Sequence, residues 1–289
     1  MNYRHHFHAG NFADVLKHAV TLRLVAAMQR KPKGFLYLDT HAGRGGYDLT
    51  GAARGDSLER QSEWPDGIGR LWTAPDLPVA LAEYVEAVRA YDRRQGNLTA
   101  APRFYPGSPA LVGAVLREQD RMVLCERQPD ECAALRMAMA RTPRCTVSES
   151  NGYTAVRAQL PPPERRALVL IDPPFEGESE FADIADALRK GLRRLPDAVM
   201  AIWYPLTRRA RVDAFFEALA GASLPATLAA EIEVADDDAP IKMRGCGVVV
   251  VNPPWQVAAE LEPAVQALGQ LLAQRAGAVG RLTWLVPER

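Results

Sequence analysis

The sequence predicts an α/β fold: a mostly parallel, doubly wound sheet with helices on both faces. Short apolar runs, such as residues 167–171 and 248–251, are typical of strands buried on both faces. Segments with helical spacing of apolar residues alternate with these runs. That alternation is expected of parallel strands joined by helical crossovers.

Local patterns predict each element in turn. Asn11 is a suitable cap for a helix that runs to about Arg30, because apolar residues recur at helical spacing behind it. Further helices are expected over 77–94, 108–118, 129–141, 181–195, 211–221 and 258–275. The expected strands are 35–38, 121–127, 144–150, 167–171, 197–205, 226–235, 245–251 and a short terminal strand, 281–286.

Residues 50–102 differ from the rest of the chain. They are rich in charge and turn residues, contain helical stretches and lack a convincing buried strand. We therefore expect two parts: a doubly wound domain formed by residues 1–49 and 103–289, and an inserted helical subdomain, 50–102.

The composition argues against a membrane-spanning or secreted protein and gives no support for a nucleic-acid partner. The chain has 289 residues, of which 48% are hydrophobic and 24% charged. Its 35 basic and 35 acidic side chains give a net charge of zero, so the overall charge does not indicate a nucleic-acid partner. No apolar run approaches the roughly 20 residues that span a bilayer, and the N-terminus has no signal-peptide core. Four scattered cysteines indicate reduced thiols, and we expect a cytoplasmic protein without a membrane partner.

Two proline pairs follow apolar strands, at Asp172–Phe175 and Asn252–Trp255. In a 3-2-1-4-5 strand order the fourth strand borders the first at the switch point, so Asp172 opens into the main crevice. The short turn before 245–251 implies an antiparallel strand whose end lies at the opposite edge. The downstream pair is thus expected to be structural, with Trp255 covering an edge of the core.

The first pair suits chemistry on an exocyclic amine. The Asp172 carboxylate and the Pro173 carbonyl can each accept one N–H of the amine, which localises its lone pair. The prolines fix the backbone that presents this carbonyl. Phe175 offers a face on which a flipped base can stack. A plain strand stop is the alternative interpretation.

A resemblance adds to these observations. The segments "YRHHFHAGNFADVLKH", "FLYLDTHAGRGGYDL", "FYPGSP", "LIDPPFE", "WYP" and "VVNPPW" resemble the RlmJ family of 23S ribosomal RNA adenine-N6 methyltransferases. The likeness runs from Tyr3 to the C-terminus in the same order. It implies a Rossmann-like class I methyltransferase sheet of order 3-2-1-4-5-7-6, with one antiparallel strand and a helical insertion after strand 1.

The resemblance also implies function. It implies S-adenosyl-L-methionine as cofactor and N6 methylation of one flipped adenine of 23S ribosomal RNA, adenine 2030, on free or partly assembled RNA by a monomer. Asp172 is then the catalytic residue. Implied cofactor contacts are His18, His41, Ser108, Glu126, Asn151 and Gly152, and implied substrate contacts are Tyr3, His5, Lys17, Pro173 and Phe175.

Glu126 has an independent rationale, because an acid after the second strand can accept both ribose hydroxyls. The residues depart from the common methyltransferase pattern in two places. His41 stands where a first glycine is usual, which matches the family. Asn151 replaces an aspartate, and we expect its amide oxygen to accept a hydrogen bond from the cofactor's adenine amino group.

Three alternatives stay open. The same site could methylate DNA adenine or a protein glutamine amide, and a non-catalytic RNA-binding scaffold is possible. A dehydrogenase is disfavoured because the first turn lacks Gly-x-Gly-x-x-Gly. The five histidines, His5, His6, His8, His18 and His41, could bind metal, but no cysteine or acidic cluster completes a site, so no metal is expected.

Overall fold

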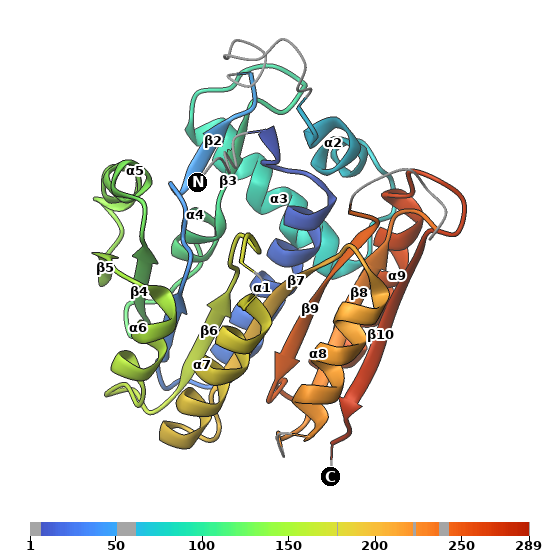
Figure 1. Ribbon diagram of the computed structural model, residues 1–289. Helices are drawn as coiled ribbons and strands as arrows, with labels where there is room; N and C mark the ends of the chain where they lie inside the picture. The colour runs from blue at the N-terminus through green and yellow to red at the C-terminus, as the bar shows by residue number, and fades with distance from the viewer. Residues whose placement is uncertain (1–6, 51–61, 178, 222–223, 237–242, 289) are drawn as a thin grey trace.

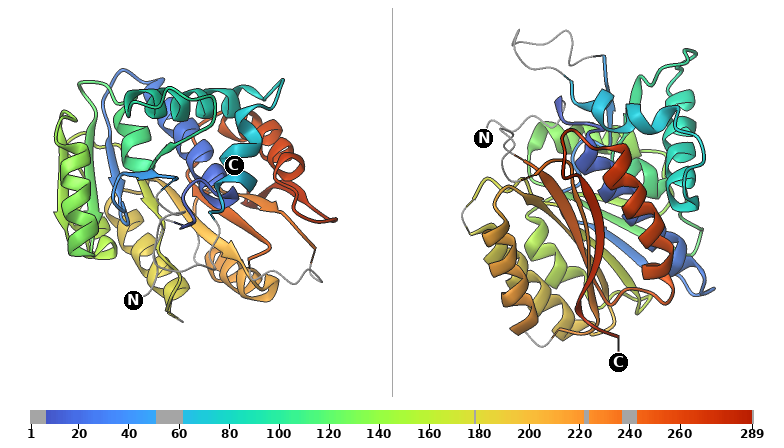
Figure 2. Two further views of the ribbon diagram at one scale, coloured as in Figure 1. Left: turned by 90° about the horizontal axis from the view of Figure 1, so that it is seen from above. Right: turned by 90° about the vertical axis from the view of Figure 1, so that its right-hand side faces the viewer.

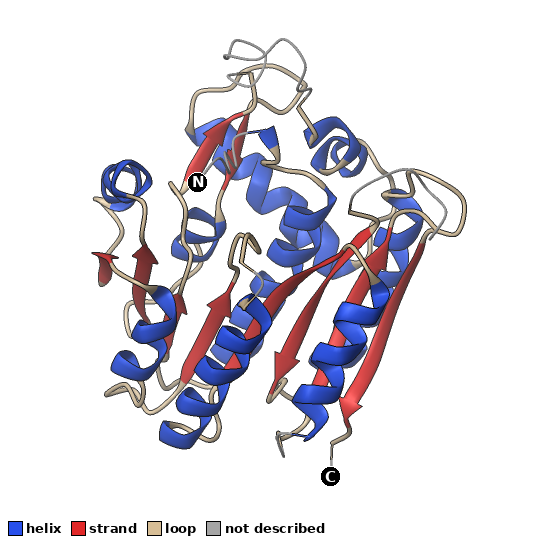
Figure 3. Ribbon diagram, in the orientation of Figure 1, coloured by secondary structure: helices blue, strands red, loops and turns tan. Residues whose placement is uncertain are grey.

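The structure is a computed structural model that describes residues 7–50, 62–177, 179–221, 224–236 and 243–288. A central sheet carries helices on both faces (Figures 1 and 3). No helix in these ranges is long and apolar enough to cross a membrane. The elements are α1 (Phe12–Gln29), β1 (Leu36–Asp39), β2 (Gly46–Asp48), η3 (Trp64–Asp66), α2 (Ile68–Trp72), α3 (Val79–Arg94), β3 (Phe104–Pro106), α4 (Ser108–Gly113), β4 (Arg121–Glu126), α5 (Pro129–Met139), β5 (Cys145–Glu149), α6 (Gly152–Gln159), β6 (Ala167–Ile171), α7 (Glu180–Arg194), β7 (Val199–Leu206), α8 (Arg209–Gly221), β8 (Thr227–Glu233), β9 (Gly245–Val251), α9 (Val257–Leu271) and β10 (Val279–Val286).

The sheet order is β10-β8-β9-β7-β6-β1-β4-β5. Strands β5, β4, β1, β6 and β7 are parallel, and β9 pairs antiparallel with both β7 and β8. The predicted order 3-2-1-4-5-7-6 is therefore confirmed. The terminal strand, predicted without a position, is β10, which extends the edge antiparallel to β8. Two strands, rather than one, thus run against the parallel set.

The two faces of the sheet bury separate apolar clusters. One cluster holds side chains of α1, α4, α5 and α9, and the other holds side chains of α6, α7 and α8. Figure 2 (right) shows these two helical layers with the sheet between them. Parallel strands covered on both faces must be apolar throughout, as in β6, where all five residues are buried.

The helices η3, α2 and α3 fall within the predicted insertion, flanked by the small antiparallel pair β2–β3. Apolar residues of α2 and α3 share one cluster with α1 and the sheet. The division of the chain into two domains stays a prediction. Besides η3 and α2, which fall in the region expected to contain helical stretches, three of the described elements were not expected from the sequence: α6, β2 and β3. Each is short, with three to eight residues, which leaves little periodic signal.

The end of β9 lies where the strand direction predicted. Val251 pairs with Met200 near the start of β7, so Asn252 is at the edge opposite to Asp172. The Asn252 amide donates hydrogen bonds to the carbonyls of Pro196 (2.7 Å) and Ala198 (2.9 Å). The prediction for Trp255 was wrong: its side chain is 74% exposed, because the turn into α9 carries it outward rather than over the core.

Candidate active site at the carboxyl edge of the sheet

Strand register brings the predicted residues to one edge. Asp39 of β1 is level with Leu124 of β4 and with Leu170 of β6. His41, Glu126 and Asp172 each lie two residues beyond these aligned positions, so they stand side by side at the carboxyl ends of three adjacent strands. Ligands of open α/β sheets bind at this position, where the strand order reverses.

Asp172 is held by a lysine from the first helix. The Lys17 ammonium lies 2.6 Å from Asp172 Oδ2 and 2.8 Å from Asp14 Oδ1. The Asp172 side chain is 17% exposed, whereas those of Lys17 and Asp14 are 7% and 2% exposed. No described residue donates a hydrogen bond to Asp172 Oδ1. One carboxylate oxygen is thus fixed, and the other remains available to a ligand.

The positive charge of Lys17 is balanced by the negative charges of Asp14 and Asp172. Burial by itself lowers the pKa of Lys17, but attraction and hydrogen bonds from Asp14 and Asp172 outweigh it and raise that pKa well above its ordinary value. Lys17 therefore stays protonated at neutral pH. Sequence reasoning found Lys17 and missed Asp14, although the spacing of three residues on one helix face was a usable signal.

Asp39, the last residue of β1, is buried at the same edge of the sheet. Its Oδ2 accepts hydrogen bonds from the Ser108 hydroxyl (2.7 Å) and the Tyr37 hydroxyl (3.1 Å), and its Oδ1 accepts from the His41 amide (3.3 Å). Burial raises the pKa of Asp39 to about 6, although the hydrogen bonds partly offset it. Ser108 therefore supports the turn after β1 through Asp39.

His41 lies in that turn. Its Nδ1 is 2.8 Å from the Thr40 hydroxyl, and its ring packs edge-on against Tyr153 at 5.2 Å between centroids. Burial lowers the pKa of His41 to about 4, even though the negative charge of Asp172 raises it. The imidazole is consequently neutral at pH 7 and can accept or donate one hydrogen bond.

Glu126 and the glycine turn are joined directly. Glu126 Oε2 accepts from the Gly43 amide (2.9 Å), and Oε1 accepts from the Gln128 amide (2.8 Å). Gly43 has a φ of +60°, a conformation that glycine adopts at little cost. The carboxylate therefore stands against the turn that follows β1.

Asn151 and Gly152 start α6 beside the same turn. A Cβ on Gly152 would lie 2.0 Å from the Thr40 carbonyl oxygen, so only glycine permits this approach. Asn151 Oδ1 accepts from the Tyr153 and Thr154 amides (2.9 and 3.2 Å) as the helix cap. Its oxygen, expected to serve the cofactor's adenine, is already engaged, so the free polar group of this side chain is the amide NH₂.

His18 of α1 is buried. It is 2% exposed, its Nδ1 is 2.8 Å from the Tyr105 hydroxyl, and Tyr105 in turn meets the Tyr84 hydroxyl at 2.9 Å. The two rings of His18 and Tyr105 are stacked at 5.6 Å. His18 thus links α1 to β3 and α3 below the crevice.

Phe175 stands next to Asp172 in an aromatic cluster. Its ring packs edge-on against Phe181 (5.1 Å) and Trp203 (5.7 Å). Its φ of +49° costs a non-glycine residue about 1–2 kcal/mol. Such strain concentrates at functional sites. Pro173 is buried, and Phe175 is partly exposed.

Tyr3 and the histidines near the N-terminus complete the set of residues considered from the sequence. Tyr3 and His5 lie outside the described residues, as does His6. His8, for which the sequence indicated no specific role, pairs with Glu63 (2.9 Å), and Glu63 also accepts from the Asn11 amide (2.8 Å). Among the residues described, no three His, Cys, Asp or Glu side chains are grouped to hold a metal ion.

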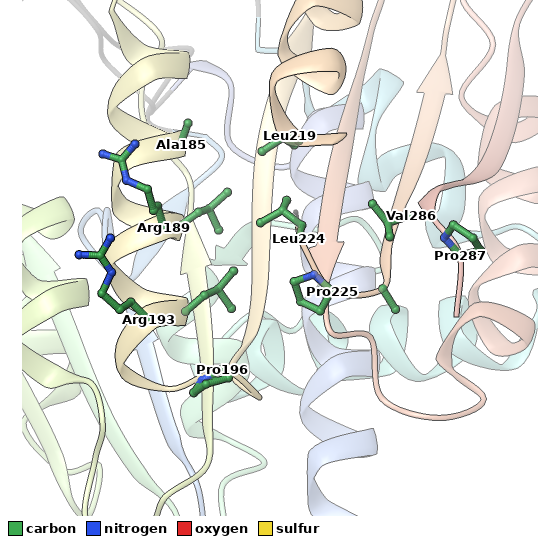
Figure 4. A pocket seen from close by; sticks show the side chains of 12 residues that line it. Ala185, Arg189, Arg193, Pro196, Leu219, Leu224, Pro225, Val286 and Pro287 are labelled. Carbon is green, nitrogen blue, oxygen red and sulfur yellow. The ribbon is translucent and has the colours of Figure 1, made fainter. Parts of the chain in front are cut away.

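A cavity of about 670 Å³ lies at the opposite end of the molecule. Side chains of α7 line one side, and Leu219, Leu224 and Pro225 line the other (Figure 4). The segments before β7 and β8 border it, so it is at the amino edge of the parallel strands. None of the predicted site residues lines it.

Three comparisons with known proteins bear on this site. The family model described as "Ribosomal RNA large subunit methyltransferase D, RlmJ" matches residues 32–286. Proteins named Ribosomal RNA large subunit methyltransferase J from Escherichia coli K12 and Haemophilus influenzae are 35% and 36% identical over 288 residues, covering 100% of each chain. The crystal structure of protein LPL1258 from Legionella pneumophila has a TM-score of 0.84 and 31% identity, covering 96% of this chain and 98% of that one.

Proposed function

Since the chain belongs to the RlmJ family of ribosomal RNA large subunit methyltransferases, we propose that it methylates the exocyclic N6 amine of one adenine in 23S ribosomal RNA. The target base is flipped into the crevice beside Asp172. One observation carries the proposal: Asp172 presents a carboxylate with one oxygen held by Lys17 and the other open, next to a partly exposed aromatic ring.

The donor is S-adenosyl-L-methionine, as the family and fold imply, and when bound it supplies an electrophilic methyl group. The residues of the carboxyl edge fit it. The turn 39–45 approaches α6 so closely that Gly152 has no room for a Cβ. We assign its binding to His18, His41, Ser108, Glu126, Asn151 and Gly152. Glu126 suits ribose hydroxyls, whereas Ser108 and His18 act from beneath through Asp39 and Tyr105.

Asp172 orients the amine. An adenine amino group is a weak nucleophile because its lone pair is delocalised into the ring. Asp172 Oδ1 accepts one N–H and the Pro173 carbonyl accepts the other, which directs the lone pair toward the methyl donor. The same carboxylate takes the proton that the nitrogen loses. Positioning of this kind converts binding into a lower barrier.

Lys17 and Phe175 are two further side chains that position the adenine: Lys17 acts through Asp172, and Phe175 contacts the base. Lys17 holds Asp172 Oδ2 at 2.6 Å, which fixes the direction in which the other carboxylate oxygen points. Phe175 stacks on the extruded base. Tyr3 and His5 are proposed to approach the base from the N-terminal segment.

The wider proposal follows the relatives' names. Ribosomal RNA is favoured over DNA or a protein glutamine because both full-length relatives are named ribosomal RNA methyltransferases. We further propose that the protein acts in the cytoplasm as a monomer on free or partly assembled 23S RNA, at adenine 2030.

The test combines a substrate panel with Asp172→Ala. Purified protein is incubated with labelled S-adenosylmethionine and 23S RNA, DNA or protein, and the products are digested and analysed as nucleosides. We expect N6-methyladenosine from RNA alone. Asp172→Ala should lower kcat by at least about 10²-fold, with cofactor affinity nearly unchanged. Asp197→Ala, an exposed carboxylate at the other edge, should behave as wild type.

Two results would contradict the proposal. Label recovered in DNA or in a glutamine side chain would assign the site to a different substrate. Normal turnover by Asp172→Ala would show that this carboxylate does not handle the amine.

A further inference from the structure

Four aromatic side chains form a set of contacting rings between the turn at Asp172 and α8. We call this set the aromatic wall; its members are Phe175, Phe181, Trp203 and Phe215. Phe181 packs against Phe175 with 5.1 Å between ring centroids and against Phe215 with 4.6 Å. Phe175 also meets Trp203 of β7. The ends of β6 and β7 lie at the same edge of the sheet (Figure 1), and the ring contacts connect the proposed base site to α8 there.

Arg211 lies on this wall. Its guanidinium carbon is 5.8 Å from the centroid of the Phe181 ring. Since Phe181 is 5.1 Å from Phe175, the Arg211 guanidinium is no more than about 11 Å from the ring beside Asp172. A planar guanidinium stacked on a ring is pre-organised and keeps its outer N–H groups free for a ligand.

Within the described part of the chain, no carboxylate neutralises the charge of Arg211. Arg211 is exposed and forms no ion pair with any described residue. Arg209, two residues away, is different: it pairs with Glu231 at 2.9 Å and with Asp213 at 2.8 Å. Neighbouring Arg208 is also exposed and makes no ion pair in the described part of the chain. Arg208 and Arg211, which follow the carboxyl end of β7, are thus two exposed cations without a carboxylate partner among the described residues.

We propose that Arg211, supported by Phe181, binds a backbone phosphate of the RNA next to the flipped adenine. This rests on the proposed function and adds a residue to it. Extruding a base brings its flanking phosphates toward the protein surface. A guanidinium fork binds phosphate oxygens through two parallel N–H bonds. Arg208 adds to the local positive potential, which suits an RNA strand although the whole chain has no net charge.

The test is Arg211→Ala against Arg193→Ala. Arg193 is an exposed arginine beside the cavity at the amino edge (Figure 4), so its loss removes the same charge away from the crevice. Steady-state methyl transfer gives KM for 23S RNA, KM for S-adenosylmethionine and kcat, and RNA affinity is measured from 50 to 200 mM salt.

For Arg211→Ala we expect KM for RNA to rise about tenfold. The slope of log affinity against log salt should fall by about 0.7 to 1. KM for the cofactor and the thermal midpoint should stay unchanged. Arg211→Lys should restore the salt slope without restoring KM, because lysine keeps the charge and loses the planar fork. Arg193→Ala should leave every value at the wild-type level.

Wild-type KM and salt slope in an active Arg211→Ala protein would overturn this inference and leave the proposed function intact. An equal effect of Arg193→Ala on KM for RNA and on the salt slope would also overturn it. The effect of Arg211→Ala would then come from the loss of any positive charge rather than from a phosphate contact at this position. A wild-type protein that neither binds nor methylates 23S RNA would overturn the proposed function and the inference with it.

Discussion

Lys17 is placed where an unpaired ammonium would be very costly, and two carboxylates make its position possible. Helix α1 is buried on most sides, so charges on it must be paired within the protein. Asp14 supplies one partner from the same helix and Asp172 the other from the end of β6. The sequence showed Lys17 and Asp172 as separate motifs 155 residues apart. Only the fold shows that they touch.

We predict that Lys17→Met lowers the free energy of unfolding by about 3 to 5 kcal/mol, because two carboxylates lose their buried partner. Methyl transfer should also be lost. The folded pKa of Lys17 is raised, so the stability it contributes is fully present below the unfolded pKa of about 10.4 and declines only as pH rises through the folded value. Urea unfolding at pH 7.5 measures the difference.

Lys33→Met is the matched control. Lys33 is exposed, and its replacement should change the unfolding free energy by no more than about 0.5 kcal/mol. If Lys17→Met were as stable as Lys33→Met, the ion pairs of Lys17 would not hold α1 to β6.

At the scale of elements, strand direction separates the two proline pairs. Strands β6 and β9 both end in an acid or amide followed by two prolines, and the sequences around them look equally suitable for a site. Since β9 runs antiparallel, its end lies at the amino edge, where Asn252 bonds to the chain before β7. Asn252 has a φ of +53°, which asparagine tolerates better than most residues.

We expect Asn252→Ala to reduce the unfolding free energy by about 2 kcal/mol, from two lost hydrogen bonds and a strained φ. Asn252→Gly keeps the backbone relaxed and should cost less. Trp255→Ala should be nearly neutral, because the side chain is 74% exposed. All three variants should keep methyl transfer, and denaturant titrations with a turnover assay check this. An inactive but stable Trp255→Ala protein would return this proline pair to consideration as a site.

At the scale of the whole molecule, the described helices of the predicted insertion bury apolar side chains in the cluster that α1 and the sheet share. Leu81 and Tyr84 of α3 belong to the same buried cluster as Leu16 of α1 and Val248 of β9. Arg23 and Glu83 also pair across α1 and α3 at 2.8 Å. The sequence separated residues 50–102 by composition, which records polar loops and turns rather than where apolar side chains are buried.

Leu81→Ala should therefore destabilise the whole protein by about 3 kcal/mol, with one transition. Tryptophan fluorescence, which reports on Trp64 and Trp72 as well as Trp203, should coincide with far-ultraviolet circular dichroism during urea unfolding. Val79→Ala, on the same helix but with a 70% exposed side chain, should change stability little. Two separated transitions would show that the insertion unfolds independently.

The sequence by itself determined most of the buried strands, the helices with clear periodicity and the candidate acid Asp172, whereas the order of the strands came from its resemblance to a known family. These depend on local patterns: buried strands are apolar throughout, and helices repeat every 3.6 residues. Short elements such as α6 and β2 carry too few residues for such a pattern. The outward course of Trp255 depends on how a turn leaves the sheet, which apolar character does not reveal.

Tertiary structure alone decided which polar groups meet. Lys17 of α1 pairs with both Asp14 and Asp172, and Asn151 uses its oxygen to cap α6. The Arg211 guanidinium lies over the Phe181 ring without a carboxylate partner among the described residues. The physical reason is that hydrogen bonds and ion pairs act over a few ångströms, between side chains that the chain brings together only after the sheet has formed and its two faces have been covered.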